Sequence, residues 1–156
     1  MHAQGCKHKR STMNTKDIIA ANVAGTTLMT LFSEVVSNVK GSNYNEAEIL
    51  SELLNRITPL QKQQARVAGY LGHYSVGLGF AAGYVAYLNK AKAKPNLFNS
   101  ITYGALSGVA GALIWHATFK AHPNPPGINL KDYYKQLVLA HVVFGVGAAM
   151  ALRNSK

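Results

Sequence analysis

The chain has 156 residues, of which 48% are hydrophobic and only 14% charged, whereas charged residues make up roughly 25% of an average soluble domain. Its formal net charge is +10, yet the basic residues flank the apolar segments and do not form the stripe, interleaved with aromatic residues, that is typical of nucleic-acid binding. The single cysteine, Cys6, excludes an internal disulfide and a multi-cysteine metal site. We therefore expect a single domain without a nucleic-acid partner.

Residues 1–16 are expected to form a flexible basic N-terminal tail, and the first apolar segment spans residues 18–37. Met13 is an alternative start of the chain, with residues 1–12 as an upstream extension or a flexible tail. Polar residues recur in the apolar segment at spacings of three and four, namely Asn22, Thr26, Thr30, Ser33 and Ser37. This spacing places them on one face of a helix. In a bilayer that face is expected to turn towards other helices, because hydroxyl and amide groups need partners there.

Residues 46–66 form the connection to the second apolar segment, and residues 46–58 are its amphipathic part. Apolar residues lie on one side of this stretch and charged residues elsewhere; the apolar ones are Ile49, Leu50, Leu53, Leu54 and Ile57. The pattern predicts a short amphipathic helix that lies on the membrane surface or caps the bundle.

The second apolar segment, residues 67–88, carries no formal charge. A run of about twenty uncharged residues is what a helix needs to cross roughly 30 Å of hydrocarbon. Two further apolar segments, residues 100–119 and 134–152, are separated by the helix breaker HPNPPG at residues 122–127. Trp115, Tyr133 and Tyr134 are expected to anchor the chain at the membrane interface.

Two motifs occur twice. His73-x-x-x-Gly77-x-Gly79 returns as His141-x-x-x-Gly145-x-Gly147, and Val23-Ala24-Gly25 returns as Val109-Ala110-Gly111. The apolar segments predict an all-α, polytopic membrane protein, and the repeat predicts that its helices pair as two related hairpins. Its single domain, residues 17–152, would hold four transmembrane helices as two related hairpins, plus the short amphipathic helix. Small residues let helices approach closely, so these glycines are expected to pack between helices: Gly25, Gly77, Gly79, Gly83, Gly104, Gly108, Gly111, Gly145 and Gly147.

The distribution of Lys and Arg predicts the orientation. Nine of these residues lie on the side that holds both termini and the turn at residues 89–99, and seven lie on the other side. Short loops rich in Lys and Arg tend to stay in the cytoplasm. The compact cluster of Lys90, Lys92 and Lys94 therefore favours cytoplasmic termini.

Four ionisable residues in or near the apolar segments are candidates for an intramembrane polar cluster: Glu34, His73, His116 and His141. Because the segments alternate in direction, all four are expected at comparable depth, on the side of the loop at residues 37–66. Ionisable groups inside a membrane are functional candidates by default. Three interpretations stay open. In the first, the histidines make hydrogen bonds between helices. In the second, the cluster is a proton- or ion-responsive site. In the third, His73 and His141 ligate a haem or a metal.

Sequence signatures of enzymes are absent, including a phosphate-binding loop, a Gly-x-Ser-x-Gly elbow and a His-Glu-x-x-His motif. We therefore expect no catalytic residue, no enzyme activity, and no resident cofactor or metal. A soluble helical bundle stays as the alternative to a membrane protein, because buried core helices can also be apolar all round.

Three motifs carry a family resemblance: Ala24-Gly25 with Met29-Thr30, Gly-His-Tyr-x-x-Gly-x-Gly at residues 72–79, and Ala-His-x-x-Phe-Gly-x-Gly at residues 140–147. Over most of residues 14–152 the chain resembles uncharacterised small bacterial inner-membrane proteins with four spans. The resemblance implies a multi-pass protein of the cell inner membrane and assigns no catalytic residue. The expected function is that of a small accessory or structural subunit, which contacts the lipid bilayer and binds through its helices to itself or to another membrane protein. A transport or proton-responsive protein is the alternative.

Overall fold

The computed structural model describes residues 12–154, and within this range the chain forms five helices. They are α1 (Thr15–Lys40), α2 (Glu46–Ile57), α3 (Lys62–Lys90), α4 (Leu97–Ala121) and α5 (Leu130–Asn154). The all-α prediction is confirmed. Each predicted apolar segment lies inside α1, α3, α4 or α5, and the predicted amphipathic segment coincides with α2. Most of the predicted N-terminal tail, residues 1–11, lies outside the described residues.

Local capping explains where α1 begins and ends. The side chain of Asn14 accepts a hydrogen bond from the backbone of Lys16, and the Asp17 side chain accepts one from the backbone of Asn14. This reciprocal pair satisfies backbone donors that have no partner inside the helix. At the other end Gly41 adopts a left-handed conformation with φ of 64°, which glycine tolerates at a helix C-terminus.

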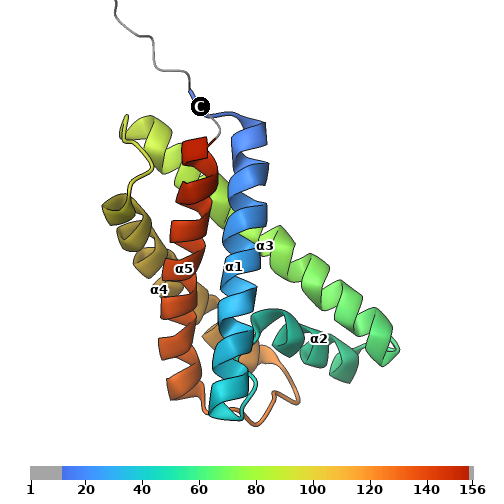
Figure 1. Ribbon diagram of the computed structural model, residues 1–156. Coiled ribbons are helices and arrows are strands. Elements are labelled where there is room, and N and C mark those ends of the chain that lie inside the picture. The colour runs from blue at the N-terminus through green and yellow to red at the C-terminus, as the bar shows by residue number, and fades with distance from the viewer. Residues whose placement is uncertain (1–11, 155–156) are drawn as a thin grey trace, which may run out of the picture.

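Helix α5 lies at the centre of the arrangement. Figure 1 shows α1 and α5 side by side and antiparallel, with α4 on the other side of α5, and the largest helix interfaces are α1 with α5 and α4 with α5. Helix α3 crosses obliquely behind α1, and its first half projects away from the bundle together with α2. The interface between α2 and α3 is the next largest.

The predicted pairing of helices as two related hairpins is not shown by this arrangement. Helices α4 and α5 do pack together, but the larger interface of α1 is with α5 and not with α3. The first half of α3 instead packs against α2, where Gly69 lies on the backbone of Ala47 and Ser51 and Arg66 pairs with Glu48. In the described part of the chain, α1, α4 and α5 are long and apolar enough to cross a membrane. Helix α3 is longer, at 29 residues, but its tyrosine, glycine and histidine residues lower its mean hydropathy.

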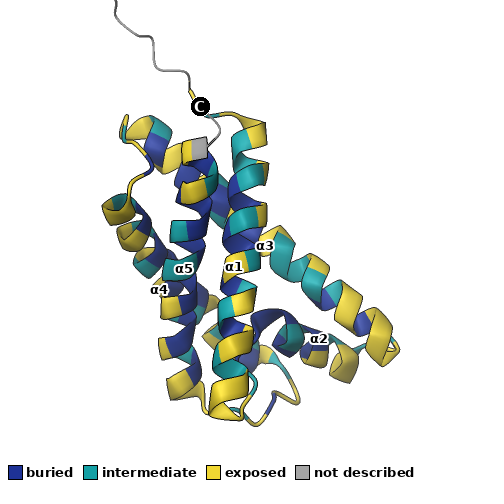
Figure 2. Cartoon of the chain, viewed as in Figure 1, coloured by how far each residue is buried: buried dark blue, intermediate teal, exposed yellow. Residues whose placement is uncertain are grey.

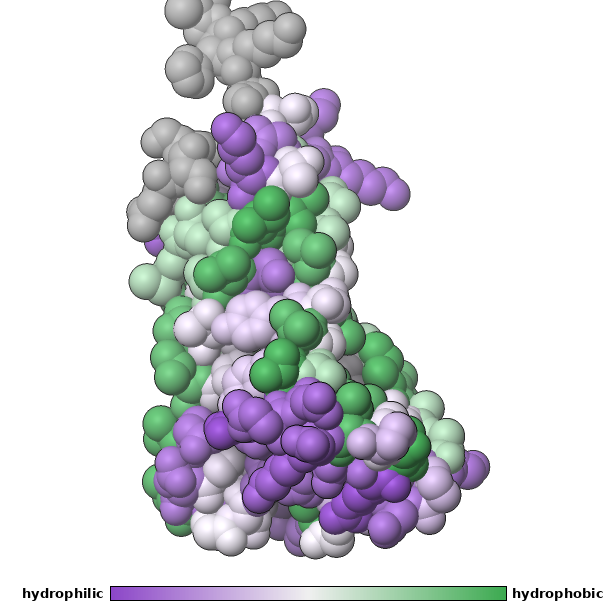
Figure 3. Space-filling model, turned by 90° about the vertical axis from the view of Figure 1, so that its right-hand side faces the viewer, coloured by the Kyte–Doolittle hydropathy of each residue, from purple (hydrophilic) through white to green (hydrophobic). Residues whose placement is uncertain are grey.

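Large apolar side chains are exposed along the sides of the bundle. Figure 2 shows exposed residues recurring along the outer faces of the long helices, while the faces between helices are buried. Figure 3 shows hydrophilic residues gathered at both ends of the visible face, with hydrophobic and weakly polar residues between them. The exposed apolar residues include Ile19, Val23, Leu31 and Val35 of α1, Val67, Leu71, Val76 and Leu78 of α3, Ile101, Leu106, Val109, Leu113 and Ile114 of α4, and Leu139 of α5.

Glycines bring α5 into backbone contact with α4. A Cβ added at Gly104 would lie 2.6 Å from both the carbonyl oxygen of His141 and the Cα of Val142. One added at Gly108 would lie 2.7 Å from the Cα of Val138. A Cβ at Gly145 would collide with the carbonyl oxygen of Ser100 in the same way. These separations are too short for any side chain, so the two helices touch only because the positions are glycines.

Glycines also bring α5 close to α1. A Cβ at Gly25 would lie 2.8 Å from the Phe144 ring, and one at Gly147 would lie 3.1 Å from the carbonyl oxygen of Ala24. Gly79 is the predicted packing glycine that differs, because among the described residues no atom of another helix lies within 4 Å of a Cβ built there. A Cβ at Gly83 would lie 2.7 Å from the Tyr103 hydroxyl of α4, so Gly83 packs against the end of that side chain.

The α2–α3 interface depends on a glycine that sequence reasoning did not select. A Cβ added at Gly69 would lie 2.7 Å from the backbone nitrogen of Ser51 and 2.8 Å from the carbonyl oxygen of Ala47. Gly69 therefore allows α3 to lie directly on the backbone of α2.

Replacing Gly104 tests the glycine contacts. In Gly104→Ala the new methyl group would strike backbone atoms of α5, and such overpacking costs about 1–3 kcal/mol. We expect a lower midpoint for thermal unfolding of the detergent-solubilised protein, followed by circular dichroism. The matched control is Gly79→Ala, where the methyl group enters open space and alanine gains up to about 1 kcal/mol of helix propensity. Equal effects of the two substitutions would contradict the α4–α5 packing.

Candidate functional site

The polar stripe of α1 faces other helices, as the sequence predicted. Asn22, Thr26 and Ser33 are buried. The amide nitrogen of Asn22 donates to the carbonyl oxygen of Tyr74 on α3 at 3.2 Å, and Thr26 donates to the Asn22 amide oxygen at 2.9 Å. Gly77 of α3 leaves room for both side chains, because a Cβ there would lie 2.7 Å from the amide oxygen of Asn22 and even closer to the Thr26 hydroxyl.

The lower part of this stripe leads to a buried carboxyl group. Glu46 is the first residue of α2 and is only 1% exposed. The Ser33 hydroxyl donates to Glu46 Oε1 at 3.1 Å, and Gln136 Nε2 of α5 donates to the Ser33 oxygen at 2.8 Å. Asn45 fixes the start of α2, since its side-chain oxygen accepts hydrogen bonds from the backbones of Ala47 and Glu48. The network thus joins α1, α2 and α5 at one carboxyl group.

The network is incomplete. Among the described residues, three buried side-chain atoms have no hydrogen-bond partner: Glu46 Oε2, Gln136 Oε1 and the Tyr133 hydroxyl. Nor does Glu46 form an ion pair with any residue in the described range. Most buried polar atoms in proteins have a partner, so such a group in the interior needs an explanation.

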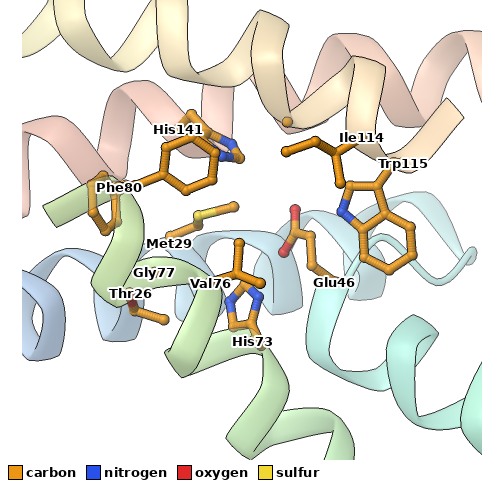
Figure 4. Close-up of a pocket in the computed structure, with 12 residues that line it drawn as sticks. Thr26, Met29, Glu46, His73, Val76, Gly77, Phe80, Ile114, Trp115 and His141 are labelled. Carbon is orange, nitrogen blue, oxygen red and sulfur yellow. The ribbon is translucent and has the colours of Figure 1, made fainter. Parts of the chain in front are cut away.

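The free carboxyl oxygen belongs to a residue that lines a small cavity. This cavity has a volume of about 40 Å³ and is lined by Glu46, by His73 of α3 and by His141 of α5, together with mainly apolar side chains. Figure 4 shows the Glu46 carboxyl group between these two histidines, beside Met29 and Trp115. One water needs about 10–15 Å³ of such volume, so the space suits a few waters and is far too small for a haem.

Burial controls the ionisation of this carboxyl group. Loss of solvent raises the pKa of Glu46 from its ordinary value of 4.5 to about 7, although hydrogen bonds from its own backbone, from Ser33 and from Gln136 act in the opposite direction. A carboxylate in an apolar site is disfavoured relative to the neutral acid. The group therefore takes up or releases a proton near neutral pH.

The structure brings two of the four predicted cluster residues together. His73 and His141 line the same cavity, but Glu34 and His116 are exposed and lie outside it. Glu34 accepts a hydrogen bond from the Asn45 amide at 3.0 Å, and His116 lies 3.4 Å from the Tyr134 hydroxyl. The reason is helical phase. Glu34 follows the buried Ser33, and successive residues are rotated by about 100° around a helix axis. Residues at a similar depth along the helices therefore need not face the same side of the bundle.

Glu46 is the site residue that sequence reasoning missed. The amphipathic pattern placed it on the polar side of α2, with the exposed Glu52. The sequence feature that could have pointed to Glu46 is Asn45, because a helix cap fixes the direction in which the first turn enters the bundle. Two other residues differ from expectation. Tyr133, predicted at the membrane interface, is fully buried, and Trp115 lines the cavity.

The haem or metal interpretation of the histidines gains no support. In the part of the chain that the structure describes, no three His, Cys, Asp or Glu side chains gather closely enough to hold a metal ion. Comparisons with protein-family models, with curated proteins and with solved structures find no match to this chain. Its function therefore has to be inferred from the helices and the cavity themselves.

Glu46 makes the stability of the fold depend on pH. A carboxyl group with a higher pKa in the folded chain than in the unfolded chain adds stability at low pH, and this contribution is lost as pH rises through the folded value. Between about pH 4.5 and pH 7 the loss is on the order of 3 kcal/mol, since each unit of pKa corresponds to about 1.4 kcal/mol. We expect Glu46→Gln, which resembles the protonated acid, to remove this part of the pH dependence of unfolding.

The matched control is Glu52→Gln, on the exposed side of the same helix. It should keep the wild-type dependence of the unfolding midpoint on pH. If the unfolding midpoints of the wild type and Glu46→Gln depended on pH in the same way, the carboxyl group of Glu46 would not change its ionisation on folding.

Proposed function

We propose that the chain is a small integral membrane protein with four spans, which acts as an accessory or structural subunit through helix–helix contacts. The observation that carries this proposal is an exposed face of small residues on α3, which is open at Gly79 and meets only the Tyr103 side chain at Gly83. The role of this face follows from the membrane setting, from the path of α3 and from the spacing of the small residues.

The membrane setting is supported by the outer surface. Soluble monomers rarely expose apolar patches larger than a few hundred Å². Here apolar side chains are exposed along α1, α3 and α4, and the hydrophilic residues gather at the two ends. An apolar band between two polar ends is the surface that a bilayer requires, and a soluble bundle would have no use for it.

A fourth span is supported by the path of α3. Met13, just before α1, and Asn89, near the end of α3, exchange two hydrogen bonds of 3.1 Å each, from the Met13 backbone to the Asn89 side chain and back. The start of α1 and the end of α3 therefore lie at the same end of the molecule. Since α3 begins beside α2 at the opposite end, it traverses the same thickness as α1.

The exposed face of α3 carries small residues at spacings of four, four and three: Ser75, Gly79, Gly83 and Ala86. Small residues at this spacing let transmembrane helices come into close contact. Helix α3 is also the long helix that falls short of the hydropathy of a candidate span. A second helix on this face would cover exposed backbone that lipid solvates poorly. A second copy of the chain is the simplest occupant, because such a face is complementary to itself.

The orientation and the location follow the same proposal. Cytoplasmic termini are supported by the basic turn at residues 90–94, which lies at the same end as the start of α1. The cell inner membrane is supported by the resemblance to small four-span bacterial proteins.

A second candidate function, a transport or proton-responsive protein, is favoured by the buried Glu46 and its cavity.

A bulky residue on the exposed face of α3 should prevent assembly without harming the fold. In Gly79→Leu the side chain enters open space in the single chain but would hold a second helix away. We expect the wild type to self-associate in lipid vesicles, measured by energy transfer between labelled copies, and Gly79→Leu to reduce this transfer at least about tenfold in apparent affinity, or about 1.4 kcal/mol.

The matched control is Val109→Leu, an enlargement of an exposed residue on α4. It should leave the energy transfer unchanged. If Gly79→Leu associated as strongly as the wild type, the α3 face would not be the interface.

A further inference from the structure

The hydrogen bonds of His73 determine which of its ring nitrogens is free. The Thr30 hydroxyl donates its one hydrogen to the carbonyl oxygen of Thr26 at 2.8 Å. The contact of 3.2 Å between the Thr30 oxygen and His73 Nε2 therefore requires the ring nitrogen to be the donor. In the neutral ring this leaves Nδ1 without a hydrogen, as an acceptor.

His141 is oriented in the same manner. Its Nδ1 lies 3.0 Å from the carbonyl oxygen of Leu137, which can only accept, so Nδ1 carries the hydrogen. The acceptor is then Nε2. This atom lies beside Gly111 of α4, where an added Cβ would come within 2.9 Å of it. In their neutral forms, the two imidazole rings that line the cavity therefore each have one nitrogen able to accept a hydrogen bond.

No permanent cation faces Glu46 in the described part of the chain. Helix α1 presents Ser33 to it, α3 presents His73, and α4 presents Trp115. Helix α5 presents three further polar groups, namely Tyr133, Gln136 and His141. Of all these groups only the two histidines and the tyrosine titrate. An isolated carboxylate in such a site is costly, so the carboxyl group favours its neutral, protonated form.

We propose that Glu46, His73 and His141 form a proton-binding site inside the helical bundle. Glu46 Oε2 binds one proton, and waters in the cavity connect this acidic hydrogen to the acceptor nitrogens of the two imidazoles. When the pH rises, the O–H bond of Glu46 breaks, the hydrogen passes to a cavity water and from there to the solvent, and a carboxylate remains that the two imidazoles contact through water. A proton suits this cavity better than a hard metal ion such as Na⁺, because hard ions prefer oxygen donors to ring nitrogens. The site does not depend on the assembly of α3, so either proposal can fail alone.

Trp115 supplies a built-in reporter of the site. It is the only tryptophan in the sequence and it lines the cavity that contains Glu46. We expect its fluorescence in the detergent-purified full chain to show a transition near neutral pH. Glu46→Gln should abolish the transition. Two controls should retain it: Glu52→Gln on the exposed side of α2, and His116→Gln, an exposed histidine outside the cavity.

Infrared spectroscopy identifies the group that titrates. The wild type should show a carboxylic-acid C=O band that disappears through the same transition and is absent from Glu46→Gln. Ser33→Ala provides a second variant, which keeps Glu46 in place. Because Ser33 donates to Glu46 Oε1 and stabilises the carboxylate, its loss should move the midpoint upward by at least about half a unit, a threefold increase in proton affinity.

Three results would overturn the proposal. The first is a C=O band that is lost only at the pH of an ordinary glutamate, about 4.5. The second is a midpoint that falls with added NaCl but not with choline chloride at equal ionic strength, which would identify a sodium site. The third is a midpoint unchanged in both His73→Gln and His141→Gln, which would remove the imidazoles from the site.

Discussion

Close backbone contact between α5 and its two neighbours is the constraint on which the rest of the structure depends. Lipid is as apolar as a leucine side chain, so the hydrophobic effect does not drive helices together inside a bilayer, and tight packing and polar contacts have to do so. Gly104, Gly108 and Gly145 provide this packing between α4 and α5, and Gly25 and Gly147 provide it between α1 and α5. The position of α5 also determines where Gln136 and His141 lie, and hence the shape of the cavity.

The second organising feature is the way α2 enters the bundle. Its first residue, Glu46, reaches the interior, while its charged side faces outward, where Glu48 forms a salt bridge of 2.8 Å with Arg66 of α3. The far end of α2 is fastened by Arg56, which donates to the carbonyl oxygens of Asn124 and Pro125 in the loop between α4 and α5. These contacts hold a buried carboxyl group beside two histidines, in a position that an unattached surface helix would not maintain.

The sequence predicted the helices better than their partners. Apolar segments and caps define helix bounds locally, so each predicted segment falls inside an observed helix. Partner choice depends on where small residues of different helices meet, and the two similar histidine–glycine motifs therefore suggested a symmetry that the interfaces of α1 do not follow. The same limit applies to the site. Residue depth was predicted for Glu34 and His116, but helical phase turns both outward, whereas Glu46 is buried through the cap at Asn45.

The most direct test of the proposed four-span arrangement is the side of the membrane on which each loop lies. Single cysteines at Ser42, Ala91 and Pro123 in a Cys6→Ser background would be labelled with a membrane-impermeant maleimide in sealed vesicles of known orientation; all three positions are exposed. Four spans predict that positions 42 and 123 react on one side and position 91 on the other. If positions 42 and 91 reacted on the same side, and 123 on the opposite one, α3 would not cross the membrane and the four-span account would be wrong.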